Sequence, residues 1–400
     1  MTSRPCKSAC NLWWIMLEEL LDGTRVVVLL GAGGVGKTTS ASALAMAAAH
    51  QGLRVVVLTV DPAARLKDAL ELPDEPGCLH RVPLPEEARG TLDAILLDAK
   101  GLFDDLVRRL SGGGSLANAI LENPIYRNVA GAFAGSDSYM ALEQLLDIAE
   151  DERFDLVVVD TPPAAHALEL FDAPDRILAL LESNALDYLS EPLRLVGAAT
   201  SRIAQGLLTT LVLALERMTG MHLMRDISQL AADFETIAPA FRRRAEAIRD
   251  LLHGDETRFV LVSAPEPHIA SELLTFAHEV DQAGIPIDGV ILNRVYNLGH
   301  LAKMEPLTLE APGGSSRKPT NWSAGLARKL VQCHRDLEMI EEEQRVRIAQ
   351  LREGMHAVGT IPEARLWVEI PTLTPPPTSL QSVRAIASLL GQTPPANQEP

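Results

Sequence analysis

The chain has 400 residues, of which 47% are hydrophobic and 22% are charged, so it can bury one large core or two modest ones. Its 36 lysines and arginines against 53 aspartates and glutamates give a formal net charge of −17, and residues 242–244 are its only dense basic run. This balance argues against a nucleic-acid coat, which needs a positive surface to displace counterions, and we expect no nucleic-acid partner.

The cysteines and the short apolar runs indicate where the protein acts. Cys6, Cys10, Cys78 and Cys333 form no CxxC pair and no zinc-ligand spacing, which is typical of a reducing compartment. The apolar run "NLWWIML" near the N-terminus is too short to span a bilayer, and so is the run over residues 207–215. We therefore expect a cytoplasmic protein with no membrane span, in which residues 1–24 form a leader or an amphipathic helix.

Short runs rich in Val, Ile and Leu alternate with helical patterns along the chain, which predicts an α/β fold with a doubly wound, mainly parallel sheet. The runs are apolar throughout, as expected of strands that helices cover on both faces. In chain order, we predict strands over residues 25–30, 54–58, 94–97, 156–159, 259–262 and 290–292.

Two long stretches without a strand pattern predict a helical subdomain inserted into this sheet. Residues 101–150 and 175–253 carry Leu, Ile, Ala and Met at spacings of three and four. Further on, residues 305–320 are rich in Pro, Gly and Ser and predict a mobile loop, which a charged helix follows to about Arg352. With no internal repeat, we expect one P-loop domain over residues 25–392, followed by a disordered tail over 393–400.

A phosphate-binding loop, "GAGGVGKTT", follows the first predicted strand and precedes the helical pattern "TTSASALAMAAAHQG". It matches G-x-x-x-x-G-K-[ST] in the strand–loop–helix context that a P-loop NTPase requires. Lys37 is the expected catalytic cation on the β- and γ-phosphates, and the Thr38 hydroxyl is the expected Mg²⁺ ligand. We predict that ATP contacts the loop through Gly33, Gly34, Val35, Gly36, Lys37, Thr38 and Thr39.

Three polar residues at strand ends are candidates to work with this loop, because ligands bind beyond the carboxyl ends of parallel strands. Asp160 ends "FDLVVVD" and is the predicted second Mg²⁺ partner, while Asp61 ends "VVVLTVD" and would position or activate the attacking water. A helix N-cap is the alternative role for either aspartate. Asn293 ends "GVILN", where its amide could read adenine or simply end the strand.

Together these segments resemble the arsenical-pump (ArsA-type) and tail-anchored-protein-targeting ATPases, which belong to the deviant Walker-A P-loop ATPases. The resemblance rests on "GAGGVGKTT", "VDPAARLKDAL", "GSDSYMALEQL", "FDLVVVDTPPAAHAL", "VSAPEPHIASELL" and "GIPIDGVILNRV", which occur in the family's order. The longer patterns "ILENPIYRNVAGAFAGSDSYMALEQL" and "LFDAPDRIL" are most similar to bacterial ArsA-like ATPases of poorly defined role.

The resemblance implies that ATP with Mg²⁺ is held near a dimer interface and that ATP closes the two subunits. It also implies that Asp61 is the water-activating switch residue, Asp160 the magnesium partner of the second switch, and Asn293 the adenine contact. The helical insertions would then bind an effector or client.

Three departures from the family pattern stand out. Ala32 stands where the family loop carries a lysine that reaches the partner's phosphates, and losing such a cation commonly costs phosphoryl transfer several orders of magnitude. Ala164 and Ala165 stand where the family often has a glycine-containing segment. The CxxC that joins some dimers through zinc is missing, and no thiol set resembles an arsenite site.

We therefore expect an ATPase that couples dimer opening and closing to a client or partner protein, with slow turnover on its own. One alternative is a low-turnover nucleotide-binding adaptor that needs a lysine-bearing hetero-partner, and another is the ATPase subunit of an arsenite-type anion export system. The dimer could be a homodimer or a heterodimer, and the client could be hydrophobic or a membrane protein. Met218, Met221 and Met224 could line a groove for such a client, although filling the subdomain core is the simpler interpretation.

Overall fold

In a computed structural model of the chain, the described residues are 17–60, 65–127, 137–182, 223–296, 324–358, 366–373 and 379–391. The strands are β1 (Val26–Leu30), β2 (Arg54–Thr59), β3 (Leu79–Arg81), β4 (Thr91–Leu96), β5 (Leu156–Asp160), β6 (Thr257–Ser263), β7 (Gly289–Val295) and β8 (Leu366–Pro371).

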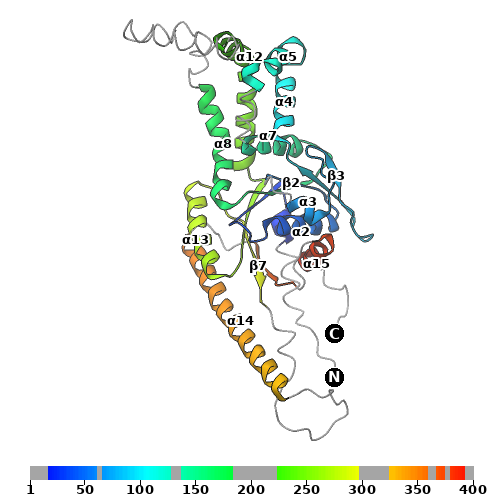
Figure 1. The fold of residues 1–400 in the computed structure, drawn as a ribbon, viewed down its shortest axis with the longest axis vertical. Coiled ribbons are helices and arrows are strands. Elements are labelled where there is room, and N and C mark those ends of the chain that lie inside the picture. Colours follow the sequence, from blue (N-terminus) through cyan, green and yellow to red (C-terminus); the bar gives the residue numbers. More distant parts are fainter. Residues whose placement is uncertain are drawn as a thin grey trace, which may run out of the picture.

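The strands form one eight-stranded sheet in the order β3-β4-β2-β5-β1-β6-β7-β8 (Figure 1). Every neighbouring pair is parallel except β3 with β4, which is antiparallel. The predicted α/β class with a mainly parallel sheet is confirmed, and each of the six predicted strands overlaps an observed one. The sequence reasoning missed β3 and β8, which are the two edge strands.

Helices cover both faces of the sheet, and alternate residues of each strand enter two separate cores. Val27 and Leu29 of β1 pack into the core that contains α2 (Lys37–His50), α3 (Arg65–Leu70) and α15 (Leu380–Gly391). Nearly every residue of α2 is buried, because α15 packs against this alanine-rich helix.

The other face of the sheet carries a second set of helices. Val26, Val28 and Leu30 of β1 pack into this core. Its helices are α7 (Asp137–Ala149), α8 (Ala164–Glu182), α12 (Leu223–His253) and α13 (Pro267–Gln282). This alternation explains why the strands are apolar throughout.

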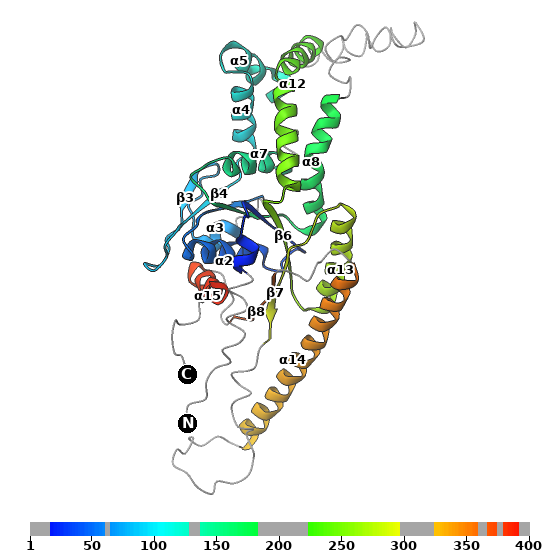
Figure 2. The same cartoon turned by 180° about the vertical axis from the view of Figure 1, so that it is seen from behind.

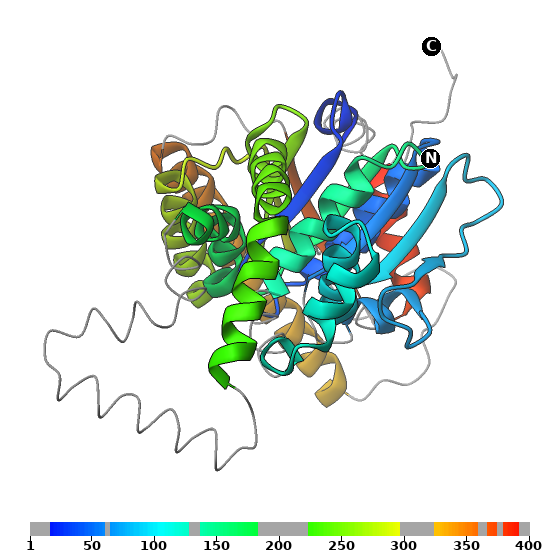
Figure 3. The ribbon, with the colours of Figure 1, turned by 90° about the horizontal axis from the view of Figure 1, so that it is seen from above.

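Several helices project from this second face. Figures 1 and 2 show α8 and α12 rising from the sheet beside α4 (Ala99–Leu110) and α5 (Gly114–Glu122), and Figure 3 shows these helices from above. The described residues of the two predicted helical stretches contain no strand, so that expectation is confirmed for them. The observed helices begin earlier than expected, since α8 starts at Ala164 and carries Pro174 inside it. The division into domains stays a prediction.

A polar cluster around the buried Glu143 joins three helices of this layer. The Arg244 guanidinium on α12 donates to Glu143 and Asp147 of α7, and Arg109 of α4 pairs with Asp147 at 2.7 Å. Glu143 also accepts a 2.7 Å hydrogen bond from the Tyr139 hydroxyl. Burial raises the pKa of Glu143, against the opposing effect of Arg244.

The charged C-terminal helix is α14 (Ala324–Val358), which continues past Arg352 and packs on α13 (Figure 2).

None of the helices in the described ranges is long and apolar enough to cross a bilayer. Residues 1–16 of the predicted 1–24 leader, the 305–320 loop and the tail lie outside the described residues, as do Met218, Met221 and the Met224 side chain. Residues 17–21 are helical, with Leu17 and Leu20 buried.

Candidate nucleotide-binding site

The loop between β1 and α2 has a backbone path that requires glycine at two positions. At Gly31, a Cβ atom would lie 2.1 Å from the carbonyl oxygen of Val262 in the neighbouring strand β6. Gly36 caps the start of α2 with a φ of +96°, and a Cβ there would lie 2.2 Å from the Asn293 amide nitrogen. Both glycines therefore let the loop turn tightly against the ends of β6 and β7.

Lys37 is the first residue of α2, and its side chain folds back over the loop. It is 6% exposed, and its ammonium group donates to the carbonyl oxygens of Gly31 and Ala32, both at 2.9 Å. Ala32 itself is partly buried and packs against the core that contains α2. The loop thus carries one fixed positive charge at Lys37, whereas position 32 contributes only a methyl group.

Asp160 meets the loop because β5 lies between β1 and β2 in the sheet. Its carboxylate accepts a 2.6 Å hydrogen bond from the Thr38 hydroxyl and a 3.4 Å one from the hydroxyl of Thr59, the last residue of β2. Asp160 is only 1% exposed. A hydroxyl and a carboxylate are the hard oxygen donors that Mg²⁺ prefers, so the residues present fit this ion.

Asn293 also contacts the loop, because the end of β7 is irregular. The pairing of β7 with β8 shifts register between Leu292 and Val295, as a β-bulge does. The Asn293 amide donates to the Val35 carbonyl at 2.9 Å, and its oxygen accepts from the backbone N–H of Arg294. Arg294 has a φ of +60°, and its guanidinium donates to the Gly34 carbonyl at 2.6 Å.

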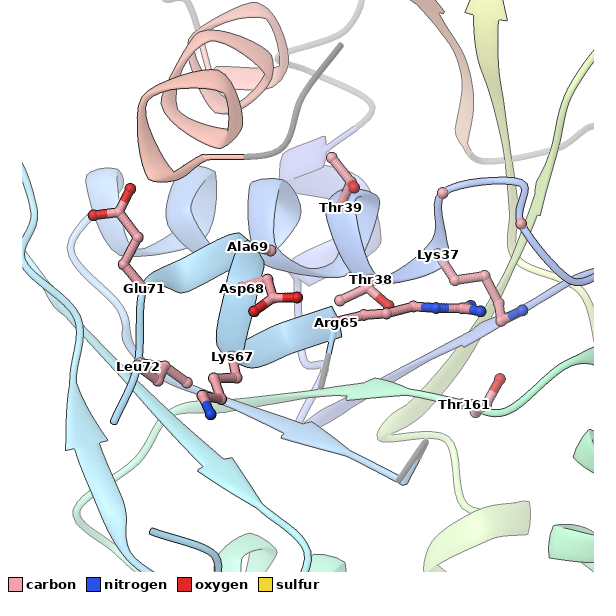
Figure 4. Close-up of a pocket in the computed structure, with 12 residues that line it drawn as sticks. Lys37, Thr38, Thr39, Arg65, Lys67, Asp68, Ala69, Glu71, Leu72 and Thr161 are labelled. Carbon is pink, nitrogen blue, oxygen red and sulfur yellow. The ribbon is translucent and has the colours of Figure 1, made fainter. Parts of the chain in front are cut away.

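A pocket of about 820 Å³ opens between the loop and α3 (Figure 4). Thr161, just after β5, lines it too, and its hydroxyl donates to the Leu29 carbonyl at 2.5 Å. Among the residues that line the pocket are Gly34, Gly36, Lys37, Thr38, Thr39, Arg65, Lys67 and Asp68. The volume is that of a typical small-molecule site.

The structure brings most of the predicted site residues together. Five of the predicted loop contacts line the pocket, while Gly33 and Val35 belong to the same loop. Asp160 and Asn293 reach the loop by hydrogen bonds. Asp61 lies outside the described residues. The roles assigned to all of these residues stay predictions.

Sequence reasoning missed three contributors to this region. Arg65 sits in the quoted segment "VDPAARLKDAL", but nothing in that pattern shows that it borders the pocket. Arg294 follows Asn293 directly, yet its contact depends on the bulge and the positive φ. Ala164 donates its backbone N–H to the Gly31 carbonyl at 3.0 Å, which ties the start of α8 to the phosphate loop.

A phosphate loop between the first strand and a buried helix, with an aspartate at the end of the adjacent parallel strand, defines a P-loop NTPase. The chain belongs to the ArsA ATPase family, whose model is described as "Anion-transporting ATPase" and matches residues 24–300. The resemblance inferred from the motifs is thereby confirmed.

The chain is also similar to several named ATPases. The chain is 25% identical over 305 residues to ATPase ARSA1 of Chlamydomonas reinhardtii, covering 71% of this chain and 36% of that protein. It is 33% identical over 172 residues to the Putative arsenical pump-driving ATPase of Halobacterium salinarum, covering 39% of this chain and 25% of that protein. It is 25% identical to ATPase GET3A of Arabidopsis thaliana over 72% of each chain. The chain thus spans well under two thirds of the first two relatives.

Proposed function

We propose that the chain is a Mg²⁺-dependent ATPase of the cytoplasm that couples ATP binding and hydrolysis to the opening and closing of a dimer, and through it to a client or partner protein. The observation that carries this proposal is the buried 2.6 Å hydrogen bond between the Thr38 hydroxyl and the Asp160 carboxylate, beside Lys37 in the phosphate loop. Cleaving a phosphoanhydride requires an oxygen ligand set for a divalent cation and a fixed positive charge at one place.

Each residue has a distinct proposed role. The loop N–H groups and Lys37 bind the phosphates, while Thr38 and Asp160 would hold Mg²⁺, which would offset the negative charge of the phosphates. Asp61 orients the attacking water. Asn293, whose amide group lies against the loop, contacts adenine through the amide hydrogen and the oxygen lone pair that its bonds to Val35 and Arg294 leave open.

A low-turnover adaptor is the second candidate, and Ala32 is the observation that favours it. The methyl group of Ala32 packs against the α2 core and offers no charge to a phosphate. A hetero-partner that carries a lysine at the equivalent loop position would then complete the site. Hydrolysis by the purified chain alone would be slow under this candidate.

An ATPase subunit for anion export is the third candidate, supported by the family's description and by the name of the haloarchaeal relative. Cys78, before β3, and Cys333, on α14, are exposed in the structure. A rise in ATP turnover on adding arsenite would favour this candidate over the other two.

Nucleotide-dependent thermal shift tests the binding that all three candidates share. ATP with Mg²⁺ at about 100 times its Kd stabilises a folded protein by about 2.7 kcal/mol, so the wild-type melting temperature should rise clearly. Lys37→Ala should abolish this rise, whereas Lys100→Ala, at an exposed site on α4, should keep it. An equal rise in Lys37→Ala and wild type would count against the proposed function.

Steady-state hydrolysis separates the first two candidates. We expect Ala32→Lys to turn over ATP faster than wild type, and oligomeric state should be measured for both proteins with and without ATP. A wild-type rate equal to that of Ala32→Lys would mean that position 32 does not limit hydrolysis.

A further inference from the structure

The wall of the pocket that faces the phosphate loop is formed by α3 and the residues just after it, and it carries both signs of charge, with the carboxylates of Asp68 and Glu71 beside two cations. Arg65 and Lys67 both line the pocket, opposite Lys37 and Thr38. Within the described residues that line this pocket, the loop and α3 both bring cations to it. Position 32, where a charge would also be near the phosphates, is an alanine.

The two cations of α3 differ in direction. Figure 4 shows the Arg65 side chain extending from the start of α3 toward Lys37 and Thr38, whereas Lys67 points away from the loop. Lys67 pairs with Asp74 at 2.9 Å, outside the pocket. Arg65 is therefore the α3 residue whose charge is directed at the place where the terminal phosphate is expected.

The helix that carries Arg65 is firmly packed. Leu66 and Leu70 on α3 are buried in the core that contains α2, and α3 also contacts α15. Arg65 itself is exposed, so its side chain can approach a ligand while its backbone is fixed. Cations held on rigid elements stabilise developing charge without reorganisation during the reaction.

We propose that Arg65 contacts the γ-phosphate of ATP and supplies, from within the same chain, positive charge that position 32 does not. In hydrolysis a bond forms from the water oxygen to the γ-phosphorus, and the bond to the bridging oxygen breaks. ADP leaves with the electron pair, and a proton from the water passes to solvent as inorganic phosphate forms. The planar guanidinium of Arg65 forks onto the γ-oxygens, over which charge is spread in the transition state. This proposal rests on the proposed ATPase function.

The test compares Arg65→Gln with wild type in two measurements. Isothermal titration calorimetry with Mg²⁺ gives the affinities for ADP and for ATPγS, and steady-state assays give kcat and KM for ATP. We expect Arg65→Gln to lose about tenfold in ATPγS affinity with little change for ADP, because only the former carries the γ-phosphate. We expect kcat to fall by about 100-fold, as when one stabilising donor is removed.

Two further variants make the outcome specific. Lys100→Gln removes a positive charge from an exposed site on α4, outside the pocket, and should match wild type within about twofold. Arg65→Lys should recover part of the ATPγS preference. Melting without nucleotide checks that each variant is folded.

The results distinguish a failure of the Arg65 assignment from a failure of the proposed ATPase function. If wild type binds neither ADP nor ATPγS, the ATPase function fails and the Arg65 assignment fails with it. If wild type binds both but Arg65→Gln keeps the wild-type ATPγS-to-ADP ratio and kcat, only the Arg65 assignment is wrong. Equal losses for ADP and ATPγS would likewise overturn a γ-phosphate contact.

Discussion

The side-chain amide of Asn293 donates a hydrogen bond of 2.9 Å to the carbonyl oxygen of Val35, 258 residues earlier in the chain. This contact ties the bulged end of β7 to the phosphate loop. Asn293 is 7% exposed, so the bond is formed away from water. The shape of the loop therefore depends on a strand from the second half of the sequence.

Asn293→Ala should weaken both the fold and nucleotide binding. The change leaves the buried Val35 carbonyl without its partner, which costs about 1–3 kcal/mol of unfolding free energy. Because the loop and the proposed adenine contact serve both nucleotides, affinity for ADP and for ATPγS should fall together, by about tenfold. Urea unfolding and calorimetry measure the two effects, with Asn118→Ala at an exposed site on α5 as the control. Wild-type ADP affinity in Asn293→Ala would show that this contact is not needed.

Asp160→Asn should reduce the dependence of ATP binding on Mg²⁺. The amide keeps the size of the side chain and can still accept a bond from Thr38, but it removes the negative charge that favours a divalent cation. The ratio of ATP Kd without Mg²⁺ to that with Mg²⁺ should drop by about tenfold relative to wild type. Calorimetry with and without a chelator gives this ratio. The proposed metal site would be wrong if the ratio did not change.

Arg244→Met should destabilise the projecting helices. It leaves Glu143, whose side chain is 2% exposed, without its cation, and breaking a buried pair typically costs about 3–5 kcal/mol. Arg242→Met, two residues away, breaks an exposed pair with Glu182 and should cost less than about 1 kcal/mol. Urea unfolding compares the two. Similar losses in both variants would mean that the Glu143 pair contributes no more than a surface ion pair.

Asp155 should make the stability of the sheet depend on pH in the acid range. Hydrogen bonds from Arg54, chiefly from its side chain, lower the pKa of Asp155 to about 2. Because the folded-state pKa is depressed, the stabilisation is present above the unfolded pKa of about 4 and is lost as pH falls toward 2. The difference in urea-unfolding free energy between wild type and Asp155→Asn should therefore shrink from pH 6 to pH 3. A constant difference over that range would contradict this linkage.

Much of the central sheet could be predicted because helices cover it on both faces. Because of that burial, the strands β1, β2, β5 and β6 are unbroken apolar runs in the sequence. Because these strands are parallel, the phosphate loop and Asp160 lie together where the strands end. The edge strands carry a weaker signal. β3 has only three residues with little burial, and β8 contains Glu369 and ends at Pro371, so neither pattern stands out from a loop.

The site was harder to predict where it depends on geometry instead of motif. Arg294 reaches Gly34 only because the bulge and its positive φ turn the chain at that point. Arg65 borders the pocket because α3 packs on α2, a tertiary contact that no spacing in "VDPAARLKDAL" encodes. Residue type at a strand end can be read from sequence, whereas the direction of a side chain across a pocket cannot.

The helix α15 and the strand β8 lie beyond residue 300, where the family match ends, yet they complete the scaffold of the loop. Val383 and Ile386 of α15 are buried in the α2 core, and β8 pairs with the bulged strand that carries Asn293. A chain cut near residue 300 would keep every nucleotide-binding motif but expose the alanine-rich side of α2 to water. The segment that matches the family model is therefore shorter than the segment that would have to be expressed or grafted as one folded piece.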